Sequence, residues 1–410
     1  MNGFGARMRR RRMLLPALAA LLGSAGPVSA QESVFSLQFL GASEETGDAR
    51  ARGMGVLGVG LDDTRTAITL NPASLGGLSA MTISVMGVGG ARTSRTADLE
   101  EDATVARFPH ERVALPLFGK VVASAGIVAV RNFRSDFTLG KLAVDGIDYV
   151  RSFERDGTLY TIPVGLAGTL GPHLRAGLTV DFLLGTIDES WVTEGDSISP
   201  LRSRRRDEMR GQTVTLGLLV RPWTWLRLGG GWNPEFTVER HREIVLEPEP
   251  ETTTTEPPPL RRETATADVR FPQSLRLGAA AALGARFQVA GDYLWREWEA
   301  YDGSAYEAES VENESRFGAG VEWTPSRKYN YRIGGSRYTW PQSVGGDRVH
   351  ETAVHVGLGI AISAGGRLDL SLEHAWIGSL DANGMEESAW RFGVSLSGQE
   401  VWKRRSPRGP

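Results

Sequence analysis

From residue 79 onward, apolar and polar residues alternate with a period of two, and this pattern constrains the fold more than any other feature of the chain. Alternation of this kind indicates a strand whose two faces meet different surroundings. It is clear, for example, in the run LRAGLTVDFLL at 174–184. The pattern predicts an all-β chain with antiparallel strands at 79–90, 111–118, 121–133, 158–170, 173–189, 210–221, 224–239, 270–283, 285–299, 314–324, 328–340, 351–363, 366–378 and 386–398. Most of these exceed the roughly 5–6 residues usual in soluble sheets and are long enough for a tilted bilayer crossing.

The connections between these strands alternate between long and short. Long loops are expected at 91–110, 134–157, 190–209, 240–269, 300–313, 341–350 and 379–385. Tight turns are expected at 119–120, 171–172, 222–223, 284, 324–327 and 364–365. Outer-membrane barrels sort their connections in this way, with long extracellular loops, short periplasmic turns and an even number of strands. We therefore predict a 14-stranded antiparallel transmembrane β-barrel over residues 79–402, followed by a short periplasmic tail at 403–410.

The tryptophans agree with a barrel that has two membrane interfaces. Aromatic side chains form girdles at both interfaces of such barrels. We expect two groups of tryptophans in the girdles. The group near the turns is Trp223, Trp225, Trp323 and Trp402. The group near the loops is Trp191, Trp298, Trp340, Trp376 and Trp390. Trp232 and Trp295 lie deeper in their strands and fit this interpretation less well.

Residues 1–30 have the layout of a secretory signal peptide. Five arginines precede a short apolar run at 13–22, and small residues at 28–30 predict cleavage after Ala30. Without those arginines, 41 Lys+Arg stand against 49 Asp+Glu, so the formal net charge of the mature chain is near −8. This charge argues against a nucleic-acid partner. The absence of cysteine excludes both disulfide bonds and lipoprotein anchoring.

Residues 31–78 precede the barrel and lack the strand alternation. Their glycines at 53, 55, 58 and 60 do not have the spacing of a nucleotide-binding loop, and no lysine follows them. The segment does contain Arg52-Gly53-Met54-Gly55, Asp62-Asp63 and Asn71-Pro72-Ala73. Pro72 fixes its own φ and Asn71 favours a turn, so this last motif predicts a rigid corner.

These three motifs resemble the N-terminal region of the outer-membrane long-chain fatty acid and aromatic hydrocarbon transporter family. The segments 331–340 and 386–402 are similar to its broader relatives. The resemblance implies an N-terminal plug, or hatch, at 31–78 inside the lumen, with Asp62, Asp63, Asn71, Pro72 and Ala73 as its motif residues. It also implies capture of hydrophobic small molecules and their lateral release through the wall into the membrane.

A lateral opening requires a strand whose hydrogen-bonded ladder is interrupted, and glycine within a strand is one means to that end. The family's opening is associated with its third strand, which points to Gly126. Gly229, Gly230 and Gly231 form a second candidate gate. Each of these glycines has the alternative role of a simple bend in the barrel.

Charged residues on the polar face of the strands are expected to face the lumen, because charge on the lipid face costs about 2–4 kcal/mol for Arg or Lys at mid-membrane. We expect a mutually paired lumen network that holds the plug, made of Arg175, Asp181, Arg276, Asp292, Arg332, Asp369 and Glu373. His355 and His374 lie on adjacent strands, but neither has a nucleophile motif or metal-ligand spacing beside it. No catalytic activity, metal or cofactor is therefore expected.

Two functions remain open at this stage. The first is a monomeric outer-membrane channel for fatty acids, aromatic hydrocarbons or lipids, with outer-membrane lipid and the barrel-assembly machinery as its other partners. The second is an accessory barrel that binds secreted or surface proteins and transports no small molecule. Apolar residues around an internal pocket favour the first function, and a solidly filled lumen favours the second.

Overall fold

The computed structural model describes residues 33–38, 41–44, 47–118, 120–144, 147–195, 198–248, 259–300, 311–362 and 365–400. The predicted signal peptide at 1–30 and the predicted tail at 403–410 lie outside the described residues. Within the described part of the chain, no helix combines the length and the apolar character needed to cross a membrane.

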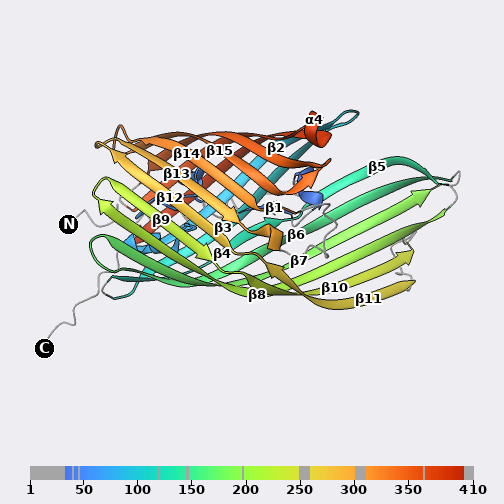
Figure 1. The fold of residues 1–410 in the computed structure, drawn as a ribbon, viewed down its shortest axis with the longest axis horizontal. Helices are drawn as coiled ribbons and strands as arrows, with labels where there is room; N and C mark the ends of the chain where they lie inside the picture. The colour runs from blue at the N-terminus through green and yellow to red at the C-terminus, as the bar shows by residue number, and fades with distance from the viewer. Residues whose placement is uncertain are drawn as a thin grey trace, which may run out of the picture.

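The wall is a ring of antiparallel strands (Figure 1). Its strand segments are β2 (Met81–Thr96), β3 (Glu100–Pro116), β4 (Val121–Asn132), β5 (Ser135–Val144), β6 (Ile147–Thr169), β7 (Leu174–Gly195), β8 (Ile198–Trp223), β9 (Leu226–Asn233), β10 (Phe236–Pro248), β11 (Arg261–Phe271), β12 (Ser274–Leu283), β13 (Phe287–Arg296), β14 (Glu314–Trp323), β15 (Tyr329–Val344), β16 (Asp347–Ala361), β17 (Gly366–Ser379) and β18 (Met385–Glu400). The ring closes where β18 pairs with β2, from Met385–Thr96 to Glu400–Met81.

Three wall strands consist of two segments each. The breaks fall at 133–134 between β4 and β5, at 234–235 between β9 and β10, and at 272–273 between β11 and β12. Pro234 and Pro272 occupy two of these breaks, and proline cannot donate a ladder hydrogen bond. Counting each pair of segments as one strand gives fourteen, so the predicted 14-stranded antiparallel barrel is confirmed.

The outer surface of the wall carries a belt of exposed apolar side chains. Examples from around the ring are Leu178, Leu216, Leu277, Phe317 and Val356, each 41–56% exposed. The residues between them on the same strands face inward and include buried charged groups. A continuous exposed apolar band with a polar interior is the surface of a transmembrane barrel.

Several connections predicted as long loops are extensions of the strands. β7 and β8 run for 22 and 26 residues, and β10 and β11 pair from Phe236–Phe271 to Leu246–Arg261. The sequence prediction was wrong here because these extensions carry polar or charged residues on both faces, which removes the apolar–polar alternation. Their backbone groups still pair across the ladder, which satisfies them without an apolar face.

The extensions form a curved sheet of β5, β6, β7, β8, β10 and β11 that projects beyond the barrel at the loop end (Figure 1). Among the described residues, β5 pairs along only one side with β6, and β11 only with β10. The sheet therefore has two open edges. Residues 261–268 of β11 are exposed on both faces.

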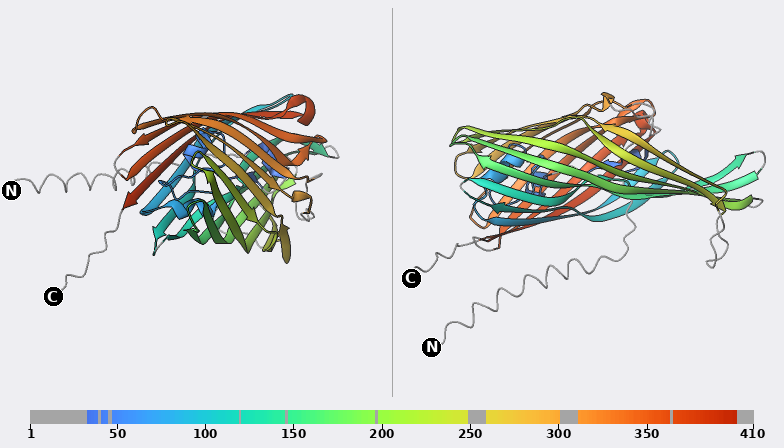
Figure 2. Two further views of the ribbon diagram at one scale, coloured as in Figure 1. Left: turned by 60° about the vertical axis from the view of Figure 1, so that its left-hand side comes forward. Right: turned by 90° about the horizontal axis from the view of Figure 1, so that it is seen from below.

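The N-terminal segment lies inside the ring of strands (Figure 2). It includes η2 (Val34–Gln38), β1 (Ala42–Ser43), α3 (Ala49–Gly53) and η3 (Pro72–Gly77). The helix α3 contacts β15, β16, β17 and β18, and η3 contacts β4, β6, β7 and β8. Wall glycines allow the two backbones to touch: a Cβ on Gly177 would lie 2.4 Å from the Pro72 carbonyl carbon, and one on Gly334 would overlap the Met54 carbonyl.

One part of the N-terminal segment also completes the wall. The ladder between β3 and β4 ends at His110–Val128. Beyond that point β1 pairs with β4 in place of β3, through Ala42–Asn132 and Ser43–Arg131. The N-terminal segment thus fills the seam where β3 and β4 separate.

The predicted tryptophan girdle is confirmed only in part. Trp223, Trp225, Trp323, Trp376 and Trp390 are 42–57% exposed on the outer surface. Trp298 and Trp340 are only 1% and 4% exposed, because they pack inward with Phe271 and with Phe35 and Tyr338. Trp402 lies outside the described residues.

Candidate functional site

The predicted motif residue Asn71 links the N-terminal segment to the wall. It is fully buried and caps η3, its Oδ1 accepting a hydrogen bond from the backbone N–H of Ala73 at 3.1 Å. Its Nδ2 donates to the carbonyls of Val59 at 3.0 Å and of Leu218 in β8 at 2.9 Å. Pro72 occupies the first turn of η3, where its missing N–H costs nothing.

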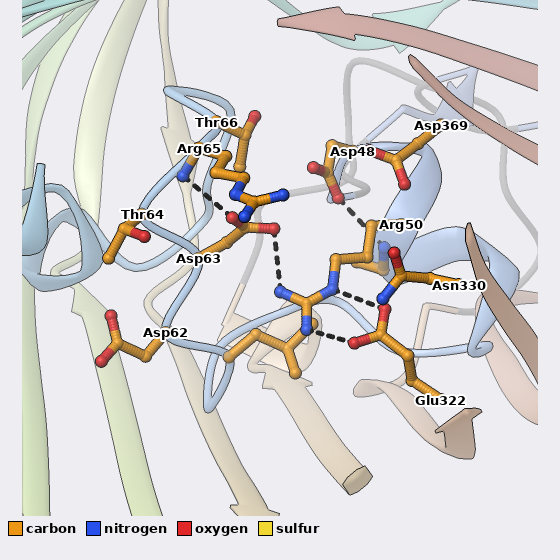
Figure 3. A network of polar contacts seen from close by, with 12 residues as sticks. Asp48, Arg50, Asp62, Asp63, Thr64, Arg65, Thr66, Glu322, Asn330 and Asp369 are labelled. Atoms are coloured by element: carbon orange, nitrogen blue, oxygen red, sulfur yellow. Dashed lines mark hydrogen bonds and ion pairs between the residues drawn. The ribbon is translucent and has the colours of Figure 1, made fainter. Parts of the chain in front are cut away.

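Asp63 belongs to a buried network that joins the N-terminal segment to three wall strands (Figure 3). Its carboxylate lies 2.8 Å from Arg50 and 3.0 Å from Arg367, and Arg50 also binds Glu322 at 2.7 Å. Burial disfavours the charged form of Asp63, yet the guanidinium groups of Arg367 and Arg50 hold its pKa well below the usual range. Glu322 and Asp369 both bind Arg332, which completes the network.

Asp48 lies next to this network, and its pKa is shifted in the opposite direction from that of Asp63. Its side chain caps α3 by accepting a hydrogen bond from the N–H of Ala51 at 3.0 Å. Burial, together with the carboxylates of Asp369 and Asp63, raises the pKa of Asp48 to about 6. The N-terminal segment therefore contains one carboxyl whose pKa is raised, Asp48, and one whose pKa is lowered, Asp63.

Asp62 points toward the turn-side mouth of the barrel. Three wall arginines surround its carboxylate, with nitrogen–oxygen distances of 2.5 Å for Arg175, 2.7 Å for Arg221 and 3.7 Å for Arg227. Asp62 and Asp63 are adjacent in sequence but bind different arginines in different parts of the lumen.

The other polar residues predicted for the lumen are buried and bonded. Asp292 accepts hydrogen bonds from the backbone N–H groups of Gly58, Val59 and Gly60. Asp181 accepts from Thr215, and Arg276 donates to Asn233. Glu373 is bound by Arg52 and Arg391.

The two candidate gates differ in structure. Gly126 faces a discontinuity between β4 and β6: the ladder runs to Ala125–Val164 and resumes at Val128–Thr161. Gly126 and Ile127 therefore lie opposite Pro163 and Ile162 without a ladder pairing to β6, although both remain paired with β3 through Arg112 and Glu111. Pro163 lacks an N–H, which accounts for the interruption.

The run Gly229–Gly231, by contrast, is fully paired with both β8 and β12. A Cβ on Gly229 would lie 2.0 Å from the carbonyl oxygen of Val59, so the residue provides space for the N-terminal segment. Gly230 and Gly231 have no atom closer than 3.7 Å to such a Cβ.

A cavity of about 920 Å³ lies in the lumen next to the interrupted ladder, and we call it the aromatic cavity. It is partly open, and Pro163 and Val128 form part of its lining. Its remaining apolar lining comes from Leu70, Pro72, Val130, Leu183, Phe236, Phe271, Pro272 and Trp298. Threonines, Asn233, Asp181 and four arginines supply polar groups. The lumen is therefore not solidly filled.

A second cavity of about 920 Å³ is rich in charge, and Glu373 is part of its lining. Ser336 Oγ lies 2.8 Å from Nε2 of His355, a pair that no local sequence motif announced. His355 Nδ1 is 3.5 Å from Glu373, whose carboxylate already binds Arg52 and Arg391. Among the described residues, no group of three or more acidic or histidine side chains is placed to hold a metal ion.

The family model named BamG matches residues 10–407, nearly the whole sequence. The chain belongs to the BamG family. No curated protein matches the sequence of this BamG-family chain at a significant level.

The fold of the BamG-family chain is similar to those of several solved outer-membrane proteins. It is similar to the CymD monoaromatic hydrocarbon channel, with a TM-score of 0.60 and 13% identity over 88% of this chain and 99% of the other. The toluene transporter TbuX of Ralstonia pickettii gives 0.60 and 15%, over 89% and 100%. A FadL homologue from Pseudomonas aeruginosa gives 0.55 and 11%, over 87% and 98%. The predicted resemblance to the transporter family is confirmed for the fold, while the family matched in sequence is BamG.

Sequence reasoning missed several residues of the site. Arg50 and Asp48 stand in a segment whose structure no periodicity reveals, and the wall partner of Arg50, Glu322, is 272 positions away. Pro163 could have been identified from the sequence, because a proline inside an apolar strand pattern indicates an interrupted ladder.

Proposed function

We propose that this BamG-family chain is an outer-membrane channel that takes up hydrophobic small molecules. The molecule enters the aromatic cavity and leaves sideways through the wall between β4 and β6. On this route an apolar molecule passes from the aromatic side of the cavity into the membrane and avoids the unfavourable free energy of entering water. Fatty acids, aromatic hydrocarbons and lipids all suit such a cavity.

A single observation carries the proposal: the aromatic cavity reaches the wall at Pro163, where the ladder between β4 and β6 is interrupted. On the outer surface of the same stretch, Ile127 is 49% exposed within the apolar belt. Separating two strands is easiest where ladder hydrogen bonds are already missing. The N-terminal segment forms one side of the cavity through Thr69, Leu70 and Pro72, which is consistent with a hatch.

A reversible cross-link across the interruption tests the exit. The register places Ile127 opposite Ile162, and directly opposed antiparallel residues have Cα atoms about 4.5–5.5 Å apart, within the range of disulfides. The chain has no cysteine of its own. We expect Ile127→Cys/Ile162→Cys to lose uptake of a labelled fatty acid or aromatic hydrocarbon when oxidised and to regain it with reductant.

The matched control joins two fully paired strands at another point of the belt. Leu166 of β6 and Leu178 of β7 are ladder partners and both face outward. Oxidised Leu166→Cys/Leu178→Cys should transport as the unmodified chain does. Equal uptake by both oxidised variants would exclude the exit between β4 and β6.

The extended sheet favours a second candidate function, the docking of another protein. An unpaired strand edge is a template for an added strand, and β11 presents such an edge without a covering segment among the described residues. Replacing 240–267 with a two-residue turn removes this edge and leaves β9 and β12 in the wall. If docking is the function, the deletion should break up a larger assembly seen on native gels of mildly solubilised membranes. If transport is the function, uptake should persist.

A further inference from the structure

The turn-side mouth of the barrel contains a cup that the transport route does not use. It has a volume of about 490 Å³ and is formed by the turns between β3 and β4 and between β6 and β7, together with the adjoining ends of β8 and β9. Its charged and ionisable lining is Asp62, Lys120, His173, Arg175, Arg221 and Arg227. The aromatic cavity shares none of these residues.

Positive charge greatly exceeds negative charge in the cup. The lining contains four cations, Lys120 and the three arginines, and a single carboxylate, Asp62, which the three arginines contact. The side chain of Asp62 is only 4% exposed, whereas that of Arg221 is 38% exposed and Lys120 lies in the open turn. The one carboxylate thus lies at the closed side of the cup, and the lining as a whole keeps an excess of positive charge toward its open side.

The cup is held in a fixed arrangement by the backbone. His173 and Arg221 exchange two hydrogen bonds, from the Arg221 N–H to the His173 carbonyl at 2.8 Å and between His173 Nδ1 and the Arg221 carbonyl at 2.9 Å. Lys120 is tied to β6 through the N–H of Thr169, which donates to its carbonyl at 3.2 Å. Since the turn between β6 and β7 is bonded to β8 and Lys120 is bonded to β6, the backbone positions of these cations are fixed relative to one another.

We propose that the cup binds a small dianion, either inorganic phosphate or a phosphate monoester, from the periplasmic side. Guanidinium groups match phosphate oxygens in geometry as well as charge, and they are often paired with phosphate for that reason. Arg221, Arg227 and Lys120 are the ligand-binding cations. Asp62 competes for the same arginines, so the cup exchanges an internal carboxylate for an external dianion with twice the charge.

Because Asp62 belongs to the N-terminal segment, the bound dianion weakens the hold of Arg175 and Arg221 on that segment. This inference is independent of the transport proposal, since it requires no hydrophobic ligand and no opening in the wall.

The test is calorimetric titration of the purified full-length barrel with inorganic phosphate, glycerol phosphate and succinate. We expect saturable binding of the phosphates. Lys120→Gln should weaken it about threefold and Arg221→Gln about tenfold, as the loss of one charge-assisted hydrogen bond implies. Asp62→Asn should tighten it about tenfold, which a merely structural cluster would not do. Tighter binding of glycerol phosphate than of phosphate identifies the monoester as the ligand, and equal binding identifies free phosphate.

Lys328→Gln is the matched control, because Lys328 is an exposed lysine in another turn at the same end of the barrel. It makes the same change in charge outside the cup and should leave affinity unchanged. Heat-modifiable gel mobility establishes that each variant is folded. The proposal is overturned if neither the unmodified chain nor Asp62→Asn binds phosphate saturably, if succinate binds as tightly as the phosphates, or if Lys328→Gln weakens binding as much as Lys120→Gln.

Discussion

The carboxylate of Asp292 lies 2.6 Å from the backbone nitrogen of Gly58, which is 234 positions earlier in the sequence. The same side chain accepts hydrogen bonds from Val59 at 3.0 Å and from Gly60 at 3.4 Å. Three successive N–H groups of a segment without regular structure thus share one acceptor on β13. Wall side chains provide the acceptor that this part of the N-terminal segment lacks within itself.

Replacing Asp292 should loosen the N-terminal segment without opening the ring of strands. In Asp292→Ala, three buried N–H groups lose their acceptor, and we expect a loss of about 1–3 kcal/mol in the local stability of 57–61. Hydrogen exchange of these amides should accelerate, while exchange in the ladder between β13 and β14 stays unchanged. Asp381→Ala, at the exposed position of helix α4 (Leu380–Asn383), is the control.

The glycines at 229 and 230 should respond differently to the same change. Gly229→Ala places a methyl group 2.0 Å from the Val59 carbonyl oxygen, so the backbone of one of them must move. We expect a destabilisation of about 1–3 kcal/mol, typical of overpacking. Gly230→Ala meets no atom nearer than 4.0 Å and should be neutral. Urea unfolding followed by tryptophan fluorescence measures both, and equal effects would contradict the close approach of the two backbones.

The N-terminal segment should be held more tightly at pH 5 than at pH 8. The pKa of Asp48 is about 6 in the folded chain against 3.8 when unperturbed. The folded state therefore binds the proton more strongly, and stability is lost as pH rises from about 4 through 6. Asp63, with its lowered pKa, contributes only below this window.

Asp48→Asn should remove this pH dependence while keeping the cap on α3. The full shift of about two pKa units corresponds to roughly 3 kcal/mol, of which roughly half is lost between pH 5 and pH 8, so the exchange protection of α3 should be about tenfold greater at pH 5 in the unmodified chain. A chain whose α3 protection is the same at pH 5 and pH 8 would rule out the role of Asp48.

Ser336 should not react as a hydrolase nucleophile despite its hydrogen bond to His355. Arg52 and Arg391 already neutralise Glu373, so little negative charge remains to stabilise an imidazolium. We expect no fluorophosphonate labelling of the folded barrel. Labelling that disappears in Ser336→Ala would instead reveal a catalytic role.

The strands could be predicted wherever one face meets lipid and the other meets the lumen, as in 174–184. The same strands were lost where both faces are polar, as in the run RSRRRDEMR of β8, because the alternation there has no contrast. The resemblance to transporters identified Asp62, Asp63 and Asn71 as a group, yet the structure gives each a different partner. Such pairings, like that of Asp292 with Gly58, depend on closure of the ring and leave no local signal.

The position of β1 beside β4 makes the interior segment part of the enclosure itself. Residues 42–43 take the place next to Asn132 and Arg131 that β3 leaves empty, so a chain without them would have a window in its side. The N-terminal segment is therefore a part of the wall as well as a filling of the lumen. Because each supplies hydrogen-bond partners to the other, the wall near β4 and the N-terminal segment should unfold together as one cooperative unit.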